Sequence, residues 1–173
     1  MAGAIALFAS ARRNGNTGKL IDHIAAQLGI EVIDLGRFRM APYDYEHRNR
    51  SDDFEPLMMR VLGHEHLIFA SPVYCYAVAP PMKVFFDRIT DFLDLEELRD
   101  HGRRLRQKTA YVVCTSIYDA PPPSFVGAFT DNFGYFGLRL GGIAHVNCAE
   151  GYDAAAGAAE ARRFANLLGS RAQ

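Results

Sequence analysis

Short apolar runs that recur at intervals along the chain place the tightest limit on its fold. We expect five β-strands, over residues 5–9, 31–35, 66–70, 109–115 and 143–148. Most of these runs are continuously apolar, whereas a sheet with one solvated face would alternate apolar and polar residues. Continuous runs that alternate with helical stretches are typical of a parallel sheet covered by helices on both faces.

The stretches between the expected strands have the features of helices. The first helix begins near Asn16 or Thr17, either of which can cap its free N–H groups, and ends at Gly29. Four more are expected after residues 51–53, from 80–81, after 121–124 and over about 153–168. This alternation predicts one α/β domain over residues 1–173: a flavodoxin-like, doubly wound, five-stranded parallel sheet of order 2-1-3-4-5 with helices on both faces.

The composition argues against several classes of function. The chain has 173 residues, 49% of them hydrophobic, and a formal net charge of −1, so it lacks the basic balance of proteins that bind nucleic acid or anionic membranes. No apolar stretch approaches the ~20 residues of a membrane span, and the N-terminus does not read as a signal peptide. The three cysteines are scattered, without a spacing typical of metal ligands or a disulfide framework. We therefore expect a cytoplasmic protein without a metal site.

A polar segment follows the first expected strand. Residues 10–17 read S-A-R-R-N-G-N-T and lead directly into a helix, whose N-terminal N–H groups favour an anion. The spacing excludes a Walker loop, because position 13 is arginine and position 20 is leucine, and it lacks the three glycines of a dinucleotide fingerprint. Side-chain donors suit a terminal phosphate monoester, so this segment favours a mononucleotide.

A second distinctive segment follows the third expected strand. Residues 71–88 read S-P-V-Y-C-Y-A-V-A-P-P-M-K-V-F-F-D-R. In the expected topology this segment lies beside the phosphate loop, where ligands of such sheets bind. Its aromatic residues, stiff prolines and small side chains suit a flat heteroaromatic ring.

These two segments resemble the NAD(P)H-dependent FMN reductase family of flavodoxin-like proteins. The shared pattern is Ser-x-Arg-x-x-Gly-Asn-Thr after the first strand and Ser-Pro-Val-Tyr-x-Tyr…Pro-x-Lys-x-Phe-x-Asp-Arg after the third. The resemblance extends from residue 5 to about residue 168. Some relatives carry a cysteine cluster after the second strand, but residues 40–45 contain no cysteine, so we expect no iron–sulfur centre.

The resemblance assigns cofactor-binding residues to three loops. The FMN phosphate would be held by Ser10, Arg12, Asn16 and Thr17, with Gly15 allowing close backbone approach. The loop beside the isoalloxazine ring would contain Pro72, Val73, Tyr74 and Tyr76, with Cys75 contributing its backbone. The third loop, near the pyrimidine side of the ring, would contain Thr115 and Ser116. No catalytic side chain is assigned, because the cofactor carries the chemistry.

The implied activity is electron transfer from NADPH or NADH through FMN to a small acceptor such as a quinone, a flavin or an azo compound. Because a second subunit commonly completes the pocket in this family, we expect a homodimer or homotetramer. The candidate interface residues are Phe85, Phe86, Ile89, Phe92 and Leu93. Two alternatives stay open, a flavodoxin-type electron carrier that does not use nicotinamide and a non-catalytic scaffold that has lost flavin. The near-neutral charge favours the reductase, since carriers tend to be strongly acidic.

Some residues invite a functional interpretation but have a simpler one. Arg13 is expected to face solvent, or to reach a partner or a nicotinamide phosphate. Cys75 is expected to be inert rather than catalytic. His64 and His66 have a metal-like spacing but no third ligand nearby in the sequence. The phenylalanines over residues 125–136 are expected to lie in the core, with an interface as the alternative.

Overall fold

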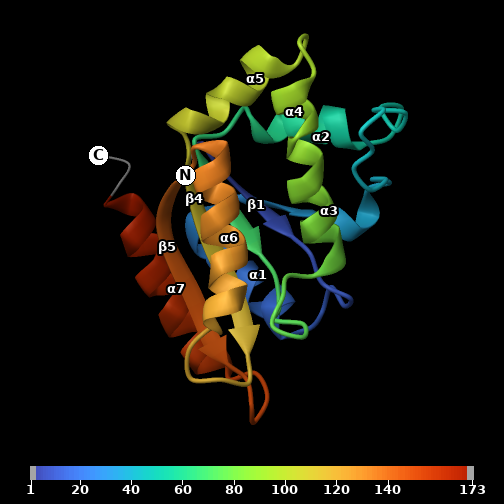
Figure 1. Ribbon diagram of the computed structural model, residues 1–173. Helices are drawn as coiled ribbons and strands as arrows, with labels where there is room; N and C mark the ends of the chain where they lie inside the picture. Colours follow the sequence, from blue (N-terminus) through green and yellow to red (C-terminus); the bar gives the residue numbers. More distant parts are fainter. Residues whose placement is uncertain (1–2, 171–173) are drawn as a thin grey trace.

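A five-stranded, all-parallel sheet forms the centre of the computed structural model, which describes residues 3–170 (Figure 1). Its strands are β1 (Ala4–Phe8), β2 (Glu31–Asp34), β3 (His66–Ala70), β4 (Thr109–Ser116) and β5 (Arg139–Asn147). The order is β2-β1-β3-β4-β5, which confirms the predicted topology. The carboxyl ends of β1, β3 and β4 consequently lie next to one another.

β5 begins earlier than predicted, at Arg139 instead of near residue 143. Gly141 and Gly142 interrupt the apolar pattern there, which hides the strand in the sequence. The glycines have a packing reason, because a Cβ at Gly141 would overlap the Tyr111 ring and a Cβ at Gly142 would overlap the Leu167 side chain. β5 therefore passes close beneath the side chains of its neighbours at this point.

The helices are α1 (Asn16–Leu28), α2 (Phe54–Val61), α3 (Pro80–Ile89), α4 (Asp91–Asp94), α5 (Arg99–Arg103), α6 (Pro123–Phe136) and α7 (Ala154–Gly169). Two 3-10 turns cover Leu35–Arg37 and Arg104–Gln107. The five predicted helices are present, whereas α4, α5 and the 3-10 turns were not expected because they are too short for a periodic pattern. None of the helices within residues 3–170 combines the length and the apolar character that crossing a bilayer requires.

Two apolar clusters explain why the central strands are continuously apolar. One cluster joins one face of the sheet to α2, α3 and α6, and the other joins the opposite face to α1 and α7. Every residue of β1, β3 and β4 is buried, while the edge strands β2 and β5 have mixed exposure. Figure 1 shows α3 and α6 on one face and α7 beside β5.

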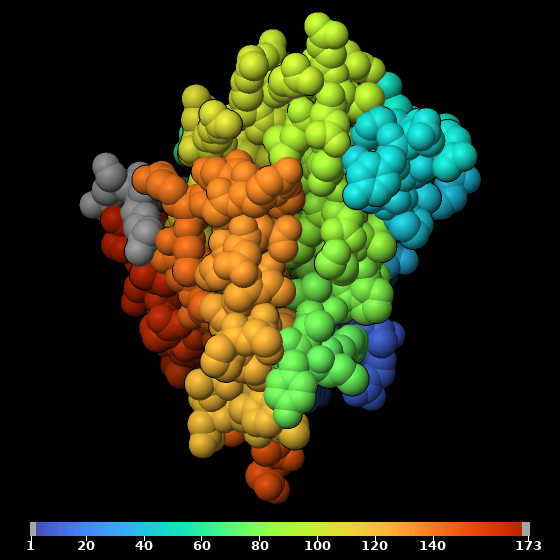
Figure 2. All heavy atoms as spheres, in the orientation of Figure 1, coloured from blue at the N-terminus to red at the C-terminus, as the bar shows by residue number. Residues whose placement is uncertain are grey.

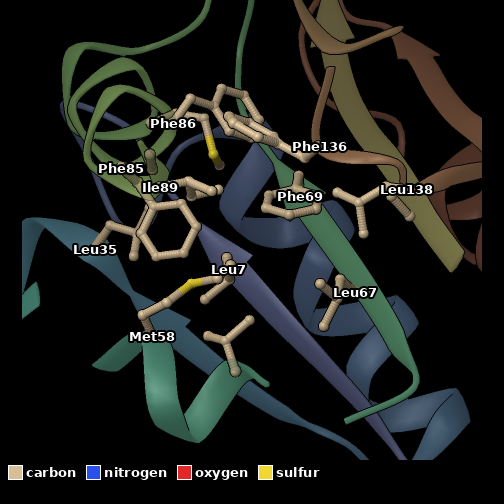
Figure 3. Packing of buried hydrophobic residues seen from close by; sticks show 14 of the residues in the cluster. Leu7, Leu35, Met58, Leu67, Phe69, Phe85, Phe86, Ile89, Phe136 and Leu138 are labelled. Atoms are coloured by element: carbon tan, nitrogen blue, oxygen red, sulfur yellow. The ribbon is translucent and has the colours of Figure 1, made fainter. Parts of the chain in front are cut away.

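The interface residues predicted on α3 and α4 are mostly wrong. Phe85, Phe86, Ile89 and Phe92 are at most 1% exposed and lie inside the chain, and only Leu93 is partly exposed. Figure 3 shows Phe85, Phe86 and Ile89 packed beside Phe69 and Leu7 of the sheet. A helix that covers a sheet has the same apolar periodicity as a helix that meets a partner, so the sequence could not separate the two cases.

The phenylalanines of α6 form part of the core, as predicted. Phe125, Phe129, Phe133 and Phe136 are all buried. Successive rings lie 5.2 and 5.9 Å apart between centroids, from Phe125 to Phe129 and from Phe129 to Phe133. The Phe129 ring also lies edge-on to Phe86 of α3, at 5.6 Å, so this stripe joins the two helices on one face of the sheet.

A buried ionic cluster fixes the irregular segment between β2 and α2. Arg88 on α3 is 1% exposed and donates from Nε to Asp91 at 2.7 Å and from Nη1 to Asp52 at 2.5 Å. Its Nη1 also donates to the carbonyl of Ala41, at 3.0 Å. His47 adds a contact from Nδ1 to Asp91, at 3.0 Å. Four side chains and a carbonyl thus join the loop to α3 and α4.

Candidate functional site

A cavity of about 360 Å³ opens at the carboxyl end of the sheet, within the range of small-molecule sites. All of the predicted cofactor-binding residues line it, namely Ser10, Arg12, Gly15, Asn16, Thr17, Pro72, Val73, Tyr74, Cys75, Tyr76, Thr115 and Ser116. Ile117, Tyr118 and Cys148 complete the lining and were not predicted. Figure 2 shows the segments after β1 (blue), β3 (green) and β4 (amber) meeting at the lower end of the molecule. The three loops therefore form one hollow, while their binding of FMN stays a prediction.

The N-terminus of α1 points its backbone donors towards this cavity without a side-chain cap. Its N-cap residue is Gly15, with an extended backbone and no capping hydrogen bond. The prediction that Asn16 or Thr17 caps the helix is wrong, because Asn16 is already helical and the Thr17 hydroxyl bonds to Thr115 at 2.7 Å. By contrast, Asp153 caps α7 by accepting from the N–H groups of two residues of its first turn. The free donors of α1 suit an external anion.

Arg12 and Arg13 are neighbours with different surroundings. Arg13 forms a two-pronged ion pair with Asp22, at 3.0 and 2.5 Å, and its guanidinium lies 5.0 Å from the centre of the Phe8 ring. The pair with Asp22 is the first cause of a raised pKa at Arg13. Arg12 lines the cavity, and within residues 3–170 its guanidinium has no hydrogen bond or ion pair. Arg12 therefore remains available to a ligand, whereas Arg13 is paired with Asp22 of α1.

Gly18 allows the loop to fold back tightly on α1. A Cβ at this position would overlap the backbone carbonyl oxygen of Arg13. Any larger residue would push the loop away from the helix. The close approach keeps the loop that precedes Gly15 beside the first turn of α1, where the free donors lie.

Tyr74 joins the second loop to the first. Its hydroxyl lies 3.1 Å from the Oγ of Ser10 and accepts from the backbone N–H of Ala11 at 3.2 Å. The N–H of Arg12 in turn donates to the Oγ of Ser10, at 3.3 Å. The place of Tyr74 beside a flavin ring stays a prediction, and its hydroxyl organises the polar loop after β1. The shapes of the two loops are therefore coupled through one side chain.

Tyr74 also begins a tight turn with an unusual backbone. The N–H and carbonyl groups of Tyr74 and Ala77 pair with each other at 2.9 Å in both directions. Between them, Cys75 and Tyr76 have φ values of 47° and 64°, the sign pattern of a type I′ turn. Bulky residues rarely adopt this left-handed region, and such strain is concentrated at functional sites. The turn exposes 58% of Tyr76 at the cavity.

An aromatic pair forms one wall of the cavity. The rings of Tyr76 and Tyr118, from two different loops, stack at a centroid distance of 5.9 Å and an interplanar angle of 23°. A hydrogen bond with Tyr76 raises the pKa of the Tyr118 hydroxyl, so this phenol is neutral near pH 7. The Ser124 hydroxyl supports this wall by donating to the Tyr76 carbonyl, at 3.3 Å. A flat, neutral surface of this kind suits a planar ring.

The two buried cysteines, Cys114 and Cys148, are not reactive thiolates. Burial raises the pKa of Cys114 to about 12 and also raises the pKa of Cys148. Both thiols therefore stay protonated and weakly nucleophilic at neutral pH. Cys75 is exposed on the strained turn. In the described part of the chain, no group of three His, Cys, Asp or Glu side chains is arranged to hold a metal ion.

The cavity lining combines anion donors with a flat aromatic surface. The uncapped α1 N-terminus and Arg12 fit a phosphate monoester, and the Tyr76–Tyr118 wall fits a planar ring. This combination matches a flavin mononucleotide better than a free phosphate or a purely apolar ligand.

Comparison with known proteins agrees with this geometry. The sequence profile of the family described as NADPH-dependent FMN reductase matches residues 4–136. A curated relative is YwqN of Bacillus subtilis strain 168, whose name describes an NAD(P)H-dependent FMN-containing oxidoreductase. It is 30% identical over 108 residues, which cover 59% of this chain and 60% of YwqN. The chain thus spans less than two thirds of that relative's length.

Two solved structures share the fold at low sequence identity. An NAD(P)H:quinone oxidoreductase from Methanothermobacter marburgensis matches with a TM-score of 0.72 and 18% identity, over 95% of this chain and 94% of its own. An FMN-dependent NADH-azoreductase from Bacillus anthracis, in complex with FMN, matches with a TM-score of 0.68 and 12% identity, over 97% of both chains. At these identities the likeness establishes the flavodoxin-like fold alone.

Proposed function

This chain belongs to the NADPH-dependent FMN reductase family, and from that premise we propose that it is an FMN-dependent oxidoreductase. It takes electrons from NADPH or NADH and passes them through FMN to a small acceptor, of the quinone, flavin or azo class. The quinone and azo classes are suggested by the names of its structural neighbours, and the flavin class by the family itself. We place this activity in the cytoplasm, in a homodimer or homotetramer.

One observation carries the proposal more than any other. The helix that follows β1 has an uncapped N-terminus, and the unpaired Arg12 lies on the same cavity. A phosphate monoester carries close to two negative charges at pH 7, and hydrogen bonds to charged groups are about twice as strong as neutral ones. Arg12 and the N-terminus of α1 therefore suit the phosphate group of FMN.

The chain's own residues position the ligand rather than react with it. FMN, when bound, supplies a ring that accepts hydride from a reduced nicotinamide and releases the electrons to an acceptor. Arg12 and the α1 N–H groups hold its phosphate, while Tyr74 keeps the phosphate loop in place through Ser10. Tyr76 and Tyr118 shield one side of the cavity from water. No side chain needs to act as acid or base on the ring, and the residues between 3 and 170 that line the cavity include no Asp or Glu.

The experiment that tests the proposal starts with purified protein and free FMN. We expect FMN fluorescence to be quenched on binding and the flavin absorption to bleach within seconds when NADPH or NADH is added without oxygen. Separate additions of benzoquinone, riboflavin and an azo dye then identify which acceptor restores the colour. Binding without bleaching by either nicotinamide would instead indicate an electron carrier. No binding of FMN would indicate a scaffold and overturn the proposal.

A further inference from the structure

A histidine outside the cavity contacts it through a serine. Ser116 is the last residue of β4, is largely buried and lines the cavity. Its Oγ lies 2.8 Å from Nε2 of His145, on the neighbouring strand β5. The N–H of Tyr118 also donates to this Oγ, at 3.2 Å. The proposed function uses Ser116 to line the cavity and gives no role to the imidazole behind it.

His145 faces a second hollow on its other side. This hollow has a volume of about 470 Å³ and lies between β5 and α7, with Glu160 and Arg163 among its lining residues. β5 is an edge strand, and α7 lies beside it (Figure 1). His145 therefore lines this surface hollow and also contacts the hydroxyl of Ser116, which would give a proton a short route from solvent to the back of the cavity.

The groups around His145 leave it able to change its charge. Burial lowers the pKa of His145, and the negative charge of Glu160 opposes that effect in part. Glu160 accepts from the backbone N–H of His145 at 3.1 Å and is paired with Arg163 at 2.6 Å. On the β4 side, Cys114 is the register partner and stays a neutral thiol. The imidazole is thus neutral near pH 7, and no carboxylate of residues 3–170 is bonded to its ring.

Two further segments flank this site. The loop after β4 carries Asp119, which accepts from the Asn147 side chain at 3.0 Å, and the neutral phenol of Tyr118. Helix α6 carries Asp131 and Tyr135 as its ionisable side chains, and within residues 3–170 no hydrogen bond or ion pair joins α6 to His145. The side chain of Ser116 therefore connects the imidazole of His145 to the cavity.

The charge of the imidazole decides which way the Ser116 proton points. When Nε2 carries no proton, it accepts from the serine hydroxyl, and Ser116 offers the cavity only a lone pair. When the ring is protonated on both nitrogens, Nε2 must donate, so the serine proton turns away from His145. Its remaining acceptor within hydrogen-bond distance in the protein is the Tyr118 carbonyl, at a long 3.4 Å. The hydroxyl is then free to donate to a ligand, which favours negative charge in the cavity.

We propose that His145 takes up a proton from solvent when bound FMN is reduced, and that Ser116 couples this proton to the charge in the cavity. The inference rests on the proposed function. A hydride brings two electrons and one proton into the cavity, which leaves one added negative charge. One proton then moves from water to the imidazole, and it returns to water when an acceptor removes the electrons. No bond forms between His145 and the ligand, so His145 is a positioning residue that acts through Ser116.

NMR of the histidine ring signals tests the proposal directly. Protein loaded with FMN is titrated with acid and base, first oxidised and then reduced by dithionite without oxygen, with His145→Gln used to assign the signal. We expect reduction to raise the pKa of His145 by one unit or more, a tenfold gain in proton affinity. Equal titration curves in the two states would overturn the proposal. Dithionite keeps this test independent of whether a nicotinamide reduces the flavin.

Three variants separate coupling from simple structural support. His145→Gln keeps a hydrogen-bonding group near Ser116 but cannot be charged, and we expect it to bind up to one proton fewer per two electrons at a pH between the two pKa values of His145, measured as the pH dependence of the flavin potential. In Ser116→Ala, His145 still titrates but reduction no longer shifts it. His64→Gln, at the other end of the sheet, leaves both measurements unchanged. Should His145→Gln fold and keep the wild-type proton count, the proposal is wrong, and should wild-type protein bind no FMN, the proposed function fails with it.

Discussion

Arg88 and Arg12 are two arginines of one chain that differ in what surrounds their guanidinium groups. Arg88 is buried, and all of its donor nitrogens are bonded, to Asp52, Asp91 and the Ala41 carbonyl. Arg12 is exposed on the cavity and has no such partner within residues 3–170. A buried charge must be paired to be tolerated, whereas an unpaired charge persists only where water or a ligand can reach it.

The backbone around the two regions differs in the same way. In the loop at Arg88, backbone N–H groups bind side chains of the same segment: those of Arg39 and Ala41 donate to Asp53 and Asp52, at 2.7 and 2.8 Å. The loop at Arg12 leads into a helix whose first turn has no side-chain cap. Polar residues that hold a fold satisfy one another, while those that hold a ligand remain open. The partners of a polar group, more than its residue type, therefore indicate its role.

Removal of the Arg88 guanidinium from its buried ionic cluster has the largest expected effect. Arg88→Met keeps most of the side-chain volume but leaves Asp52 and Asp91 without their cation. Removal of one partner from a buried pair costs about 3–5 kcal/mol. We expect that loss in the free energy of unfolding, measured by urea denaturation with circular dichroism. Arg103→Met, which breaks an exposed pair with Asp100, is the matched control and should cost below about 1 kcal/mol. Similar losses in the two variants would contradict the assignment.

Removal of the unpaired Arg12 guanidinium is expected to weaken FMN binding and to leave the stability of the fold unchanged. Arg12→Ala removes a charge-assisted bond to phosphate, worth about 1.5–3 kcal/mol, so the FMN dissociation constant should rise by about 10- to 150-fold. The measurement is FMN fluorescence quenching, with urea denaturation of the unliganded protein alongside. Arg13→Ala serves as control, because Arg13 is paired with Asp22. A loss of affinity that is equal in both variants would remove the distinction between these neighbours.

The left-handed turn at Cys75 and Tyr76 lies on the cavity and is expected to be strained when no ligand is bound. Tyr76→Gly relieves a left-handed conformation that costs a non-glycine residue about 1–3 kcal/mol, and part of that gain is offset by the greater freedom of glycine in the unfolded chain. We expect the unliganded protein to gain about 1 kcal/mol and FMN affinity to fall with the loss of the aromatic wall. Tyr45→Gly, exposed and without a left-handed backbone, should give no gain. A Tyr76→Gly protein less stable than wild type would show that the turn is not strained.

Acid is expected to have the smallest effect, because it protonates the carboxylates of the Arg88 cluster gradually as the pH falls. Burial alone would raise the pKa of Asp52, but hydrogen bonds from Arg88 and from two backbone N–H groups outweigh it and lower the pKa below 3.8. A carboxylate with a lowered pKa stabilises the fold fully above its ordinary value, and that contribution is lost as pH falls through the folded-state value.

We therefore expect the free energy of unfolding of wild type to fall below about pH 4, and Asp52→Asn to show a shallower fall. Urea denaturation between about pH 6 and pH 2.5 measures both curves. Asn cannot titrate, so the variant lacks this part of the slope although it is less stable at neutral pH. Parallel curves for the two proteins would mean that Asp52 does not contribute to the acid sensitivity.

The sequence predicted the site better than it predicted the contacts within it. Every residue predicted to bind FMN lines the cavity, because loops at the carboxyl ends of adjacent parallel strands must meet, while the binding itself stays a prediction. The links between Tyr74 and Ser10 and between Ser116 and His145 could not be read from the sequence, since they join residues 64 and 29 positions apart. Tyr118 could have been found as an aromatic residue just beyond the expected Thr115–Ser116 loop.

The missed elements share one cause. α4 and α5 are too short to show a helical period, and β5 is hidden at its start by two glycines that make room for neighbouring side chains. The interface residues were wrongly predicted for a similar reason. A helix buried against its own sheet and a helix buried against a partner have the same apolar periodicity in the sequence. Each of these cases is decided by what packs against a segment and not by the segment itself.

The order of apolar runs and the two loop motifs determined the topology, the place of the cavity and the family. These are local properties, because strand and helix periods and turn chemistry act over a few residues. Only the tertiary structure decided which polar groups neutralise one another and which stay open. That choice depends on distances between residues far apart in sequence, as at Arg88 with Asp52 and at Ser116 with His145. Pairing and burial are therefore set when the whole chain packs.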